Sequence, residues 1–181
     1  MIAADTNLHA VVEKAKKLKL LILDVDGVLT DGRLFFDHEG KEYKAFHARD
    51  GHGIKLLRQT GVEVAVISGR QSSTVALRMK SLGVEHVYQG HEDKRAALDD
   101  ILATLGIPPE QAAHVGDDLL DLPIMVRVGL AIAVQDAVSE VKQRAHAYTS
   151  LPGGNGAVRE VCDFIMQAQG HFDAVVDAYL A

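Results

Sequence analysis

The chain has 181 residues, a formal net charge of −6 at pH 7 and 48% hydrophobic residues. This length and hydrophobic content suit one domain with a substantial core, and we expect no second domain within residues 1–181. The acidic balance argues against nucleic-acid binding, which normally needs a basic excess or stripe. No apolar stretch approaches the roughly 18 residues of a membrane span, and the start of the chain lacks a secretion signal. We therefore expect a cytoplasmic protein that contacts neither nucleic acid nor membrane.

Short apolar runs alternate with amphipathic stretches along the chain. The runs predict strands over residues 20–23, 62–67, 86–88, 112–115 and 130–134. The intervening stretches predict helices over residues 50–60, 71–82 and 92–105, each followed by a glycine, with another helix after Asp118. Asp50 is expected to cap the first of these helices. The alternation predicts an α/β fold with a doubly wound parallel sheet.

Residues 33–46 break this alternation. They predict two strands joined by a turn at Asp37 to Gly40, which makes an inserted β-hairpin rather than a crossover helix. The aromatic and aliphatic side chains of this hairpin would be exposed on a monomer. We expect a partner subunit to cover them, and packing on the domain's own surface is the alternative.

Polar residues follow several of the predicted strands. Asp24 and Asp26 follow the first strand, Ser68 the second and Asp117 the fourth, while Lys94 comes a few residues after the third. Singly, such residues are most often turn formers or helix caps. Because ligands of doubly wound sheets bind at the carboxyl ends of the strands, the whole set predicts one site. Asp24, Asp26 and Asp117 offer the oxygen ligands that Mg²⁺ prefers, and zinc is disfavoured because soft and imidazole ligands are missing nearby in the sequence.

The remaining polar groups have roles that follow from their chemistry. Ser68 can donate its hydroxyl to a phosphoryl oxygen, and the Lys94 ammonium can neutralise that group and Asp24. Asp118 and Asp121 are expected to orient ligands, waters or Lys94 rather than bind the metal directly.

These motifs resemble those of the haloacid dehalogenase superfamily, whose fold is a Rossmann-like sheet. The resemblance rests on DxDG after an apolar strand, a strand-ending serine, a later lysine and a GDDxxD segment. It implies that Asp24 attacks phosphorus and becomes an aspartyl-phosphate. It also implies that Asp26 protonates the leaving oxygen and later activates water.

The chain leaves no room for the cap domain that many members of the superfamily carry. A capless chain with a hairpin resembles one branch, the 3-deoxy-D-manno-octulosonate 8-phosphate (KDO 8-phosphate) phosphatases of lipopolysaccharide biosynthesis. The resemblance covers nearly the whole chain, through LDVDGVLTDG, GKEYKAFHARDGHGIKLL, ISGRQS, HVGDDLLDLPIM and GGNGAVREVCDFI. It implies a Mg²⁺-dependent hydrolase of a sugar-acid phosphate that assembles as a homotetramer with the hairpins at its centre.

The same resemblance places the substrate contacts. Besides Asp26 and Lys94, they fall on His47, Ala48, Arg49, Asp50, Gly51, Lys55, Arg70 and Arg78. Guanidinium and ammonium groups suit the carboxylate and phosphate of a sugar acid, although Lys55 and Arg78 could also be ordinary exposed helix charges. The glycine-rich run at 152–156 is expected to be a mobile tail that folds toward a neighbouring site. No function is predicted for the C-terminal tail, residues 169–181.

Two other functions stay open at this stage. A phosphatase for a related nine-carbon sugar acid would share the hairpin and the metal motifs, although the GGNGAVRE segment favours the eight-carbon substrate. A catalytically silent oligomerisation module is the second alternative. The intact Asp24, Asp26, Lys94 and Asp117 argue against it.

Overall fold

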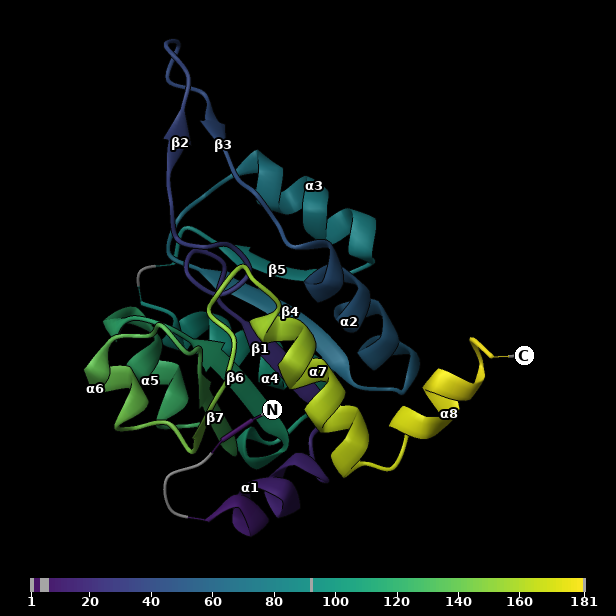
Figure 1. Cartoon of the computed structure of the whole chain (residues 1–181). Coiled ribbons are helices and arrows are strands. Elements are labelled where there is room, and N and C mark those ends of the chain that lie inside the picture. The colour runs from purple at the N-terminus through teal and green to yellow at the C-terminus, as the bar shows by residue number, and fades with distance from the viewer. Residues whose placement is uncertain (1, 4–6, 92, 181) are drawn as a thin grey trace.

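The computed structural model describes residues 2–3, 7–91 and 93–180. Its centre is a six-stranded parallel sheet with the strand order β5-β4-β1-β6-β7-β8 (Figure 1). The strands are β1 (Leu20–Leu23), β4 (Glu63–Ser68), β5 (His86–Gln89), β6 (Ala112–Gly116), β7 (Leu130–Ala133) and β8 (Ala147–Tyr148). The predicted α/β fold and its parallel, doubly wound sheet are confirmed. The two-residue strand β8 was not predicted, because so short a run gives no periodic signal.

The order of the strands places a switch point at the centre of the sheet. From β1 the chain moves outward through β4 to β5, and it then returns to the other side of β1 and builds β6, β7 and β8. Leu23 pairs with Val66 of β4 and with Val115 of β6. The loops that follow these three strands therefore leave the sheet at the same edge, where ligands of such sheets bind.

Helices cover both faces of the sheet, so β1 is buried along its whole length. Figure 1 shows α2 and α7 in front of the sheet and α4 behind it. The α-helices are α1 (Leu8–Ala15), α2 (Ala48–Gln59), α3 (Ser73–Leu82), α4 (Arg95–Leu105), α5 (Leu122–Met125), α6 (Ser139–Lys142), α7 (Ala157–Ala168) and α8 (Phe172–Asp177). Two short 3₁₀ helices are η1 (Pro109–Gln111) and η2 (Leu119–Asp121). Among the described residues, no helix is both long and apolar enough to cross a membrane.

The prediction that Asp50 caps its own helix is wrong. Helix α2 begins at Ala48, so Asp50 lies within its first turn, and its carboxylate points to another helix. The backbone N–H groups of Gly156 and Arg159 donate to Asp50 Oδ2 and Oδ1 at 3.3 and 2.8 Å. Asp50 thus caps α7 across the contact between the two helices, because the first N–H groups of a helix have no partner within it.

The predicted hairpin is present and projects away from the sheet (Figure 1). Its strands β2 (Phe35–Phe36) and β3 (Glu42–Tyr43) pair in antiparallel fashion, and Asp37 Oδ1 accepts from the backbone N–H groups of Glu39 and Lys41 in the turn. Four large apolar side chains of the hairpin are exposed, namely Leu34, Phe35, Phe36 and Tyr43, whereas Phe46 packs against the core of its own chain. Their cover by a partner subunit stays a prediction.

The glycine-rich run at 152–156 makes specific contacts in the structure. It packs on the loop after β1 of its own chain, where Gly154 N–H donates to Val28 O at 2.9 Å. A Cβ atom on Gly153 would lie 1.7 Å from Gly27 O, so this close approach of two backbones requires glycine. In this structure the run therefore belongs to the fold of its own chain, and its movement toward a neighbouring site stays a prediction.

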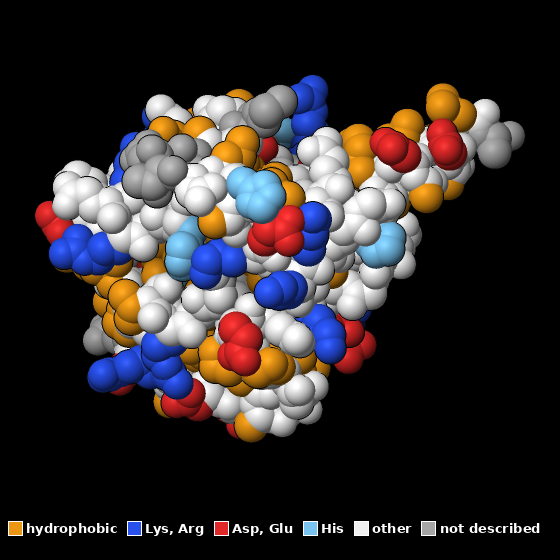
Figure 2. All heavy atoms as spheres, turned by 90° about the horizontal axis from the view of Figure 1, so that it is seen from below, with side chains coloured by type: hydrophobic (Ala, Val, Ile, Leu, Met, Phe, Trp, Pro, Cys, Tyr) orange, Lys and Arg blue, Asp and Glu red, His pale blue; other side chains and the backbone are white. Residues whose placement is uncertain are grey.

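The C-terminal helix α8 extends from the body of the molecule, as Figures 1 and 2 both show. It has no fully buried residue. Tyr179, just beyond α8, is tied to α2 by a 3.2 Å hydrogen bond between its hydroxyl and His52 Nε2. On the face seen in Figure 2, acidic and basic side chains are interspersed.

Candidate active site

The predicted strand endings meet in one cavity of about 220 Å³ at the carboxyl edge of β1, β4 and β6. Its lining residues come from the loops after these strands and from the start of α4. They are Asp24, Asp26, Ser68, Gly69, Arg70, Lys94, Asp117, Asp118 and Leu120. The structure thus brings together all of the predicted catalytic and metal-binding side chains.

Lys94 is the buried cation of the cavity. Its side chain is 1% exposed, and its Nζ atom lies 2.9 Å from Asp24 Oδ1 and 2.7 Å from Asp121 Oδ1. Burial by itself would lower the pKa of Lys94, but the two carboxylates raise it. Lys94 therefore stays an ammonium ion and fixes the Asp24 carboxylate at the carboxyl end of β1.

Asp121 holds Lys94 in place. Its Oδ1 atom accepts from Lys94 Nζ and lies 2.9 Å from His114 Nε2, while its Oδ2 atom accepts from the backbone N–H groups of Asp117 and Asp118 at 2.9 and 3.3 Å. Burial alone would raise the pKa of Asp121, but His114 and Lys94 hold it below its usual value. Asp121 is therefore an ionised group that orients Lys94, as the sequence suggested.

His114 contributes to this arrangement, although no sequence pattern indicated it. It lies within β6 with a fully buried ring, and hydrophobic neighbours surround it in the sequence. Its link to Asp121 exists because η2 folds back toward the end of β6.

Asp24 and Asp117 form an acid pair that fits a divalent cation. Oxygen atoms of Asp24, Asp117 and Asp121 all lie within 4.8 Å of one another. Burial, followed by the charge of Asp121, raises the pKa of Asp24 to about 6. Burial, followed by the charge of Asp24, raises the pKa of Asp117 to about 8. A bound cation would relieve this repulsion.

The local structure leaves oxygen atoms free for such an ion. Asp117 Oδ1 is buried and has no hydrogen-bond partner among the described residues. A Cβ atom on Gly27 would lie 2.0 Å from Asp117 Oδ2, so glycine makes room for this carboxylate. Asp118, in contrast, is exposed and accepts from Leu119 N–H at 2.7 Å as the cap of η2. Because Asp121 is already fully engaged, Asp24 and Asp117 are the side chains that fit the metal.

The Asp26 side chain does not join this acid pair. Lys44 Nζ is hydrogen-bonded to Asp26 Oδ1, and Arg70 Nε lies 3.8 Å from Asp26 Oδ2. The Oδ2 atom is buried without a hydrogen-bond partner among the described residues. A metal-binding role of the Asp26 carboxylate stays a prediction, whereas its position beside Asp24 in the cavity suits proton transfer.

Ser68 and Arg70 form the wall contributed by β4. Ser68 is buried at the end of the strand, and its Oγ atom accepts from the backbone N–H of Arg70 at 3.3 Å. The Ser68 hydroxyl hydrogen stays available for an oxygen in the cavity.

The other predicted substrate contacts lie around the start of α2. His47 Nδ1 is buried without a hydrogen-bond partner among the described residues, whereas Ala48, Arg49 and Lys55 are exposed. Arg78 is not an ordinary exposed helix charge. Its guanidinium lies 6.0 Å from the Phe46 ring centre, and a Cβ atom on Gly51 would come within 2.1 Å of Arg78 Nη2.

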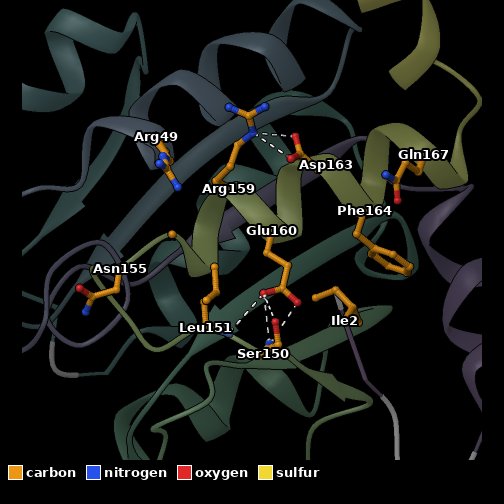
Figure 3. Close-up of a pocket in the computed structure, with 11 residues that line it drawn as sticks. Ile2, Arg49, Ser150, Leu151, Asn155, Arg159, Glu160, Asp163, Phe164 and Gln167 are labelled. Carbon is orange, nitrogen blue, oxygen red and sulfur yellow. Dashed lines mark hydrogen bonds and ion pairs between the residues drawn. The ribbon is translucent and has the colours of Figure 1, made fainter. Parts of the chain in front are cut away.

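A second cavity of about 370 Å³ lies along α7 (Figure 3). Of the predicted site residues, Arg49 is the one that lines it. Arg159 Nε donates to Asp163 at 2.7 Å, and Glu160 accepts from Ser150, so the charged side chains of Arg159 and Glu160 each have a partner of their own (Figure 3). The cavity has none of the clustered acids of the first and is not the candidate active site.

Comparison with known proteins agrees with this geometry. Residues 84–161 match the family model of the haloacid dehalogenase-like hydrolases. The chain is 49% identical over 163 residues to the KDO 8-phosphate phosphatase of Escherichia coli K12. The aligned region covers 90% of this chain and 87% of that protein.

Solved structures give the same result. The crystal structure of KDO 8-phosphate phosphatase from Yersinia pestis matches with a TM-score of 0.90 and 46% identity, covering 91% of this chain and 89% of that chain. The enzyme from Moraxella catarrhalis, in complex with a magnesium ion, a phosphate ion and KDO, matches with a TM-score of 0.94 and 41% identity, covering 96% of this chain and 99% of that chain. This chain therefore belongs to the haloacid dehalogenase-like hydrolases and, within them, to the family of the KDO 8-phosphate phosphatases.

Proposed function

We propose that this chain is a Mg²⁺-dependent phosphatase that hydrolyses KDO 8-phosphate to KDO and phosphate in lipopolysaccharide biosynthesis. The observation that carries the proposal is the Asp24 carboxylate, held by Lys94 beside Asp26 and Asp117. The Oδ1 atom of Asp117 has no hydrogen-bond partner within the described part of the chain. This arrangement occurs in a chain that is 49% identical to a phosphatase of that substrate over 90% of its length.

The first chemical step uses Asp24 and Asp26. A carboxylate oxygen of Asp24 attacks phosphorus, the bond from phosphorus to the sugar oxygen breaks, and Asp26 gives its proton to that oxygen. Lys94 and the Ser68 hydroxyl offset the negative charge on the phosphoryl oxygens. The products of this step are the free sugar acid and an aspartyl-phosphate on Asp24.

The second step restores the enzyme. Asp26, now a carboxylate, takes a proton from water while the water oxygen attacks phosphorus and the bond to Asp24 breaks. Inorganic phosphate leaves, and Asp26 carries the proton needed for the next turnover. Mg²⁺, which Asp24 and Asp117 would hold, neutralises charge on Asp24 and the phosphate when it is bound.

Substrate recognition involves the cationic groups near the start of α2. Arg78 is held against Phe46 and Gly51 without a carboxylate partner among the described residues, and His47 Nδ1 is free to hydrogen-bond. A guanidinium and an imidazole in this position suit the carboxylate or a hydroxyl of a sugar acid. Arg70 lines the cavity of the acid pair. The other predicted contacts, Ala48, Arg49, Asp50, Gly51 and Lys55, stay predictions.

A panel of phosphate esters tests the proposed substrate. We expect the kcat/KM for KDO 8-phosphate to exceed that for nine-carbon sugar-acid phosphates by at least about tenfold, since each misplaced charged or polar contact costs about 1–3 kcal/mol. A preference for a nine-carbon substrate would contradict the proposal. Absence of Mg²⁺-dependent phosphate release from every ester would instead support the silent module.

The assembly and location are also proposed here. We infer a cytoplasmic homotetramer in which the exposed Phe35, Phe36 and Tyr43 of four hairpins pack together. The single cysteine, Cys162, is buried and cannot form an internal disulfide, which suits a reducing compartment. Sedimentation equilibrium at micromolar concentration should give four times the chain mass of 19.5 kDa, and a monomer would contradict this assembly.

A further inference from the structure

One charged side chain of the hairpin is buried although its neighbours are exposed. The Lys44 side chain is 1% exposed, whereas Tyr43 and Phe36 on the same hairpin are about half exposed. Lys44 Nζ is hydrogen-bonded to Asp26 Oδ1 and lies 3.3 Å from Glu42 Oε1. The hairpin therefore places an ammonium group against the acid that transfers protons.

Glu42 and Arg70 extend the contact between Lys44 and Asp26 into a ring of charged side chains. Arg70 Nη2 donates to Glu42 Oε2 at 2.6 Å, and Arg70 Nε lies 3.8 Å from Asp26 Oδ2. Asp26 follows β1, Arg70 follows β4, and Glu42 and Lys44 belong to the hairpin. Two acids and two bases from three segments thus join the hairpin to the active-site cavity.

The two oxygen atoms of Asp26 differ in their surroundings. Oδ1 accepts the hydrogen bond from Lys44, whereas Oδ2 is buried without a hydrogen-bond partner among the described residues. A carboxyl group held at one oxygen presents the other in a fixed direction. A buried ion pair adds little to stability on average, so stability alone gives no reason for placing Lys44 here.

We propose that Lys44 is a positioning residue for Asp26: it holds Oδ1 so that Oδ2 is the atom that gives the proton to the leaving oxygen. Glu42 keeps Lys44 and Arg70 in place. This inference rests on the phosphatase chemistry proposed above, but it does not depend on which sugar is the substrate.

Lys44→Met tests the inference with substituted phenyl phosphates. Nitrophenolate leaves without a proton, whereas phenol and alcohols need one, so loss of acid catalysis is selective for poor leaving groups. We expect kcat/KM of the variant to fall by roughly tenfold or more for phenyl phosphate relative to nitrophenyl phosphate. The slope of log kcat/KM against leaving-group pKa should therefore become steeper than in the wild-type enzyme. Simple aryl esters lack the sugar, so lost sugar recognition cannot produce this change.

Lys41→Met is the matched control. Lys41 is exposed on the same hairpin, where its Nζ atom lies 5.4 Å from the Tyr43 ring centre. The Lys41→Met variant should leave the slope of log kcat/KM against leaving-group pKa unchanged. If Lys44→Met does not fold, Glu42→Gln should steepen the slope in the same direction, because it weakens the hold on Lys44.

Two results would overturn the inference. An unchanged slope would show that Lys44 acts equally on all substrates, through phosphate binding or through folding. A slope that also steepens in Lys41→Met would assign the effect to the hairpin as a whole. If the wild-type enzyme, with Mg²⁺ present, released no phosphate from aryl esters or from KDO 8-phosphate, the proposed function itself would fail.

Discussion

Asp50 is buried and Asp117 is half-buried with a buried Oδ1 atom, but the two carboxyl groups differ in their hydrogen-bond partners. Burial raises the pKa of each. Between α2 and α7, both oxygen atoms of Asp50 accept backbone N–H groups. At the carboxyl edge of β6, Asp117 has an oxygen without a hydrogen-bond partner among the described residues and faces another acid. A satisfied buried acid holds a fold together, whereas an unsatisfied one is kept for a ligand.

Replacing the nucleophile should give the largest effect on activity. We expect Asp24→Asn to lower Mg²⁺-dependent phosphate release by at least about a thousandfold, because an amide cannot form the aspartyl-phosphate. Unfolding by urea should show a free energy close to that of the wild type. Undiminished turnover in the variant would remove Asp24 from the role of nucleophile.

Replacing Asp50 should give the largest effect on stability. We expect Asp50→Ala to lower the free energy of unfolding by about 2–3 kcal/mol, because it leaves the N–H groups of Gly156 and Arg159 buried without partners. As a control, Glu140→Ala breaks an exposed pair with Arg144 and should cost less than about 0.5 kcal/mol. Equal losses of unfolding free energy in Asp50→Ala and Glu140→Ala would contradict the view that Asp50 holds the fold together.

The acid pair should make the metal-free protein less stable as pH rises. The folded pKa values of Asp24 and Asp117, about 6 and about 8, lie above the ordinary value of 3.8. The folded state therefore holds protons that the unfolded state has released, and stability falls as pH rises from about 4 to about 8. The slope for one proton is at most about 1.4 kcal/mol per pH unit.

Measurements with and without Mg²⁺ distinguish the titration of the acid pair from that of other groups. Burial lowers the pKa of His146 from its ordinary value of 6.5, so His146 works in the opposite direction, and Asp50 works in the same direction as the pair. Neither depends on the metal. We expect Mg²⁺ to stabilise the protein more at pH 8 than at pH 6, as measured by urea unfolding with and without EDTA. An equal gain at both pH values would argue against a cation at Asp24 and Asp117.

Asp117→Asn should change the free energy of unfolding by less than Asp50→Ala does, and in the opposite direction. Without metal at pH 8, we expect it to raise the free energy of unfolding by about 1 kcal/mol, because it removes one of the repelling charges. Stabilisation by Mg²⁺ should disappear in this variant. A variant that keeps the full Mg²⁺ effect would show that Asp117 does not hold the ion.

Much of the site could be predicted because it follows the strands in the sequence. Asp24, Ser68 and Asp117 come directly after apolar runs, and the ends of adjacent parallel strands meet at one edge of the sheet. The partners of these residues could not be predicted in this way. Lys44 lies 18 residues from Asp26 on a hairpin whose direction no periodicity fixes. His114 has the sequence surroundings of an ordinary core residue.

Short stretches of the chain specify the alternation of strands and helices, the turn of the hairpin and the acids at the strand ends. Each of these depends on neighbouring residues, through hydrophobic periodicity and turn chemistry. Which carboxylates have hydrogen-bond partners depends instead on the packing of distant segments. Asp50 meets Gly156 from 106 residues away, and Lys44 reaches Asp26 because the hairpin turns toward the cavity. Packing in three dimensions determines which residues distant in the sequence become hydrogen-bond partners. Local sequence patterns do not predict these pairs.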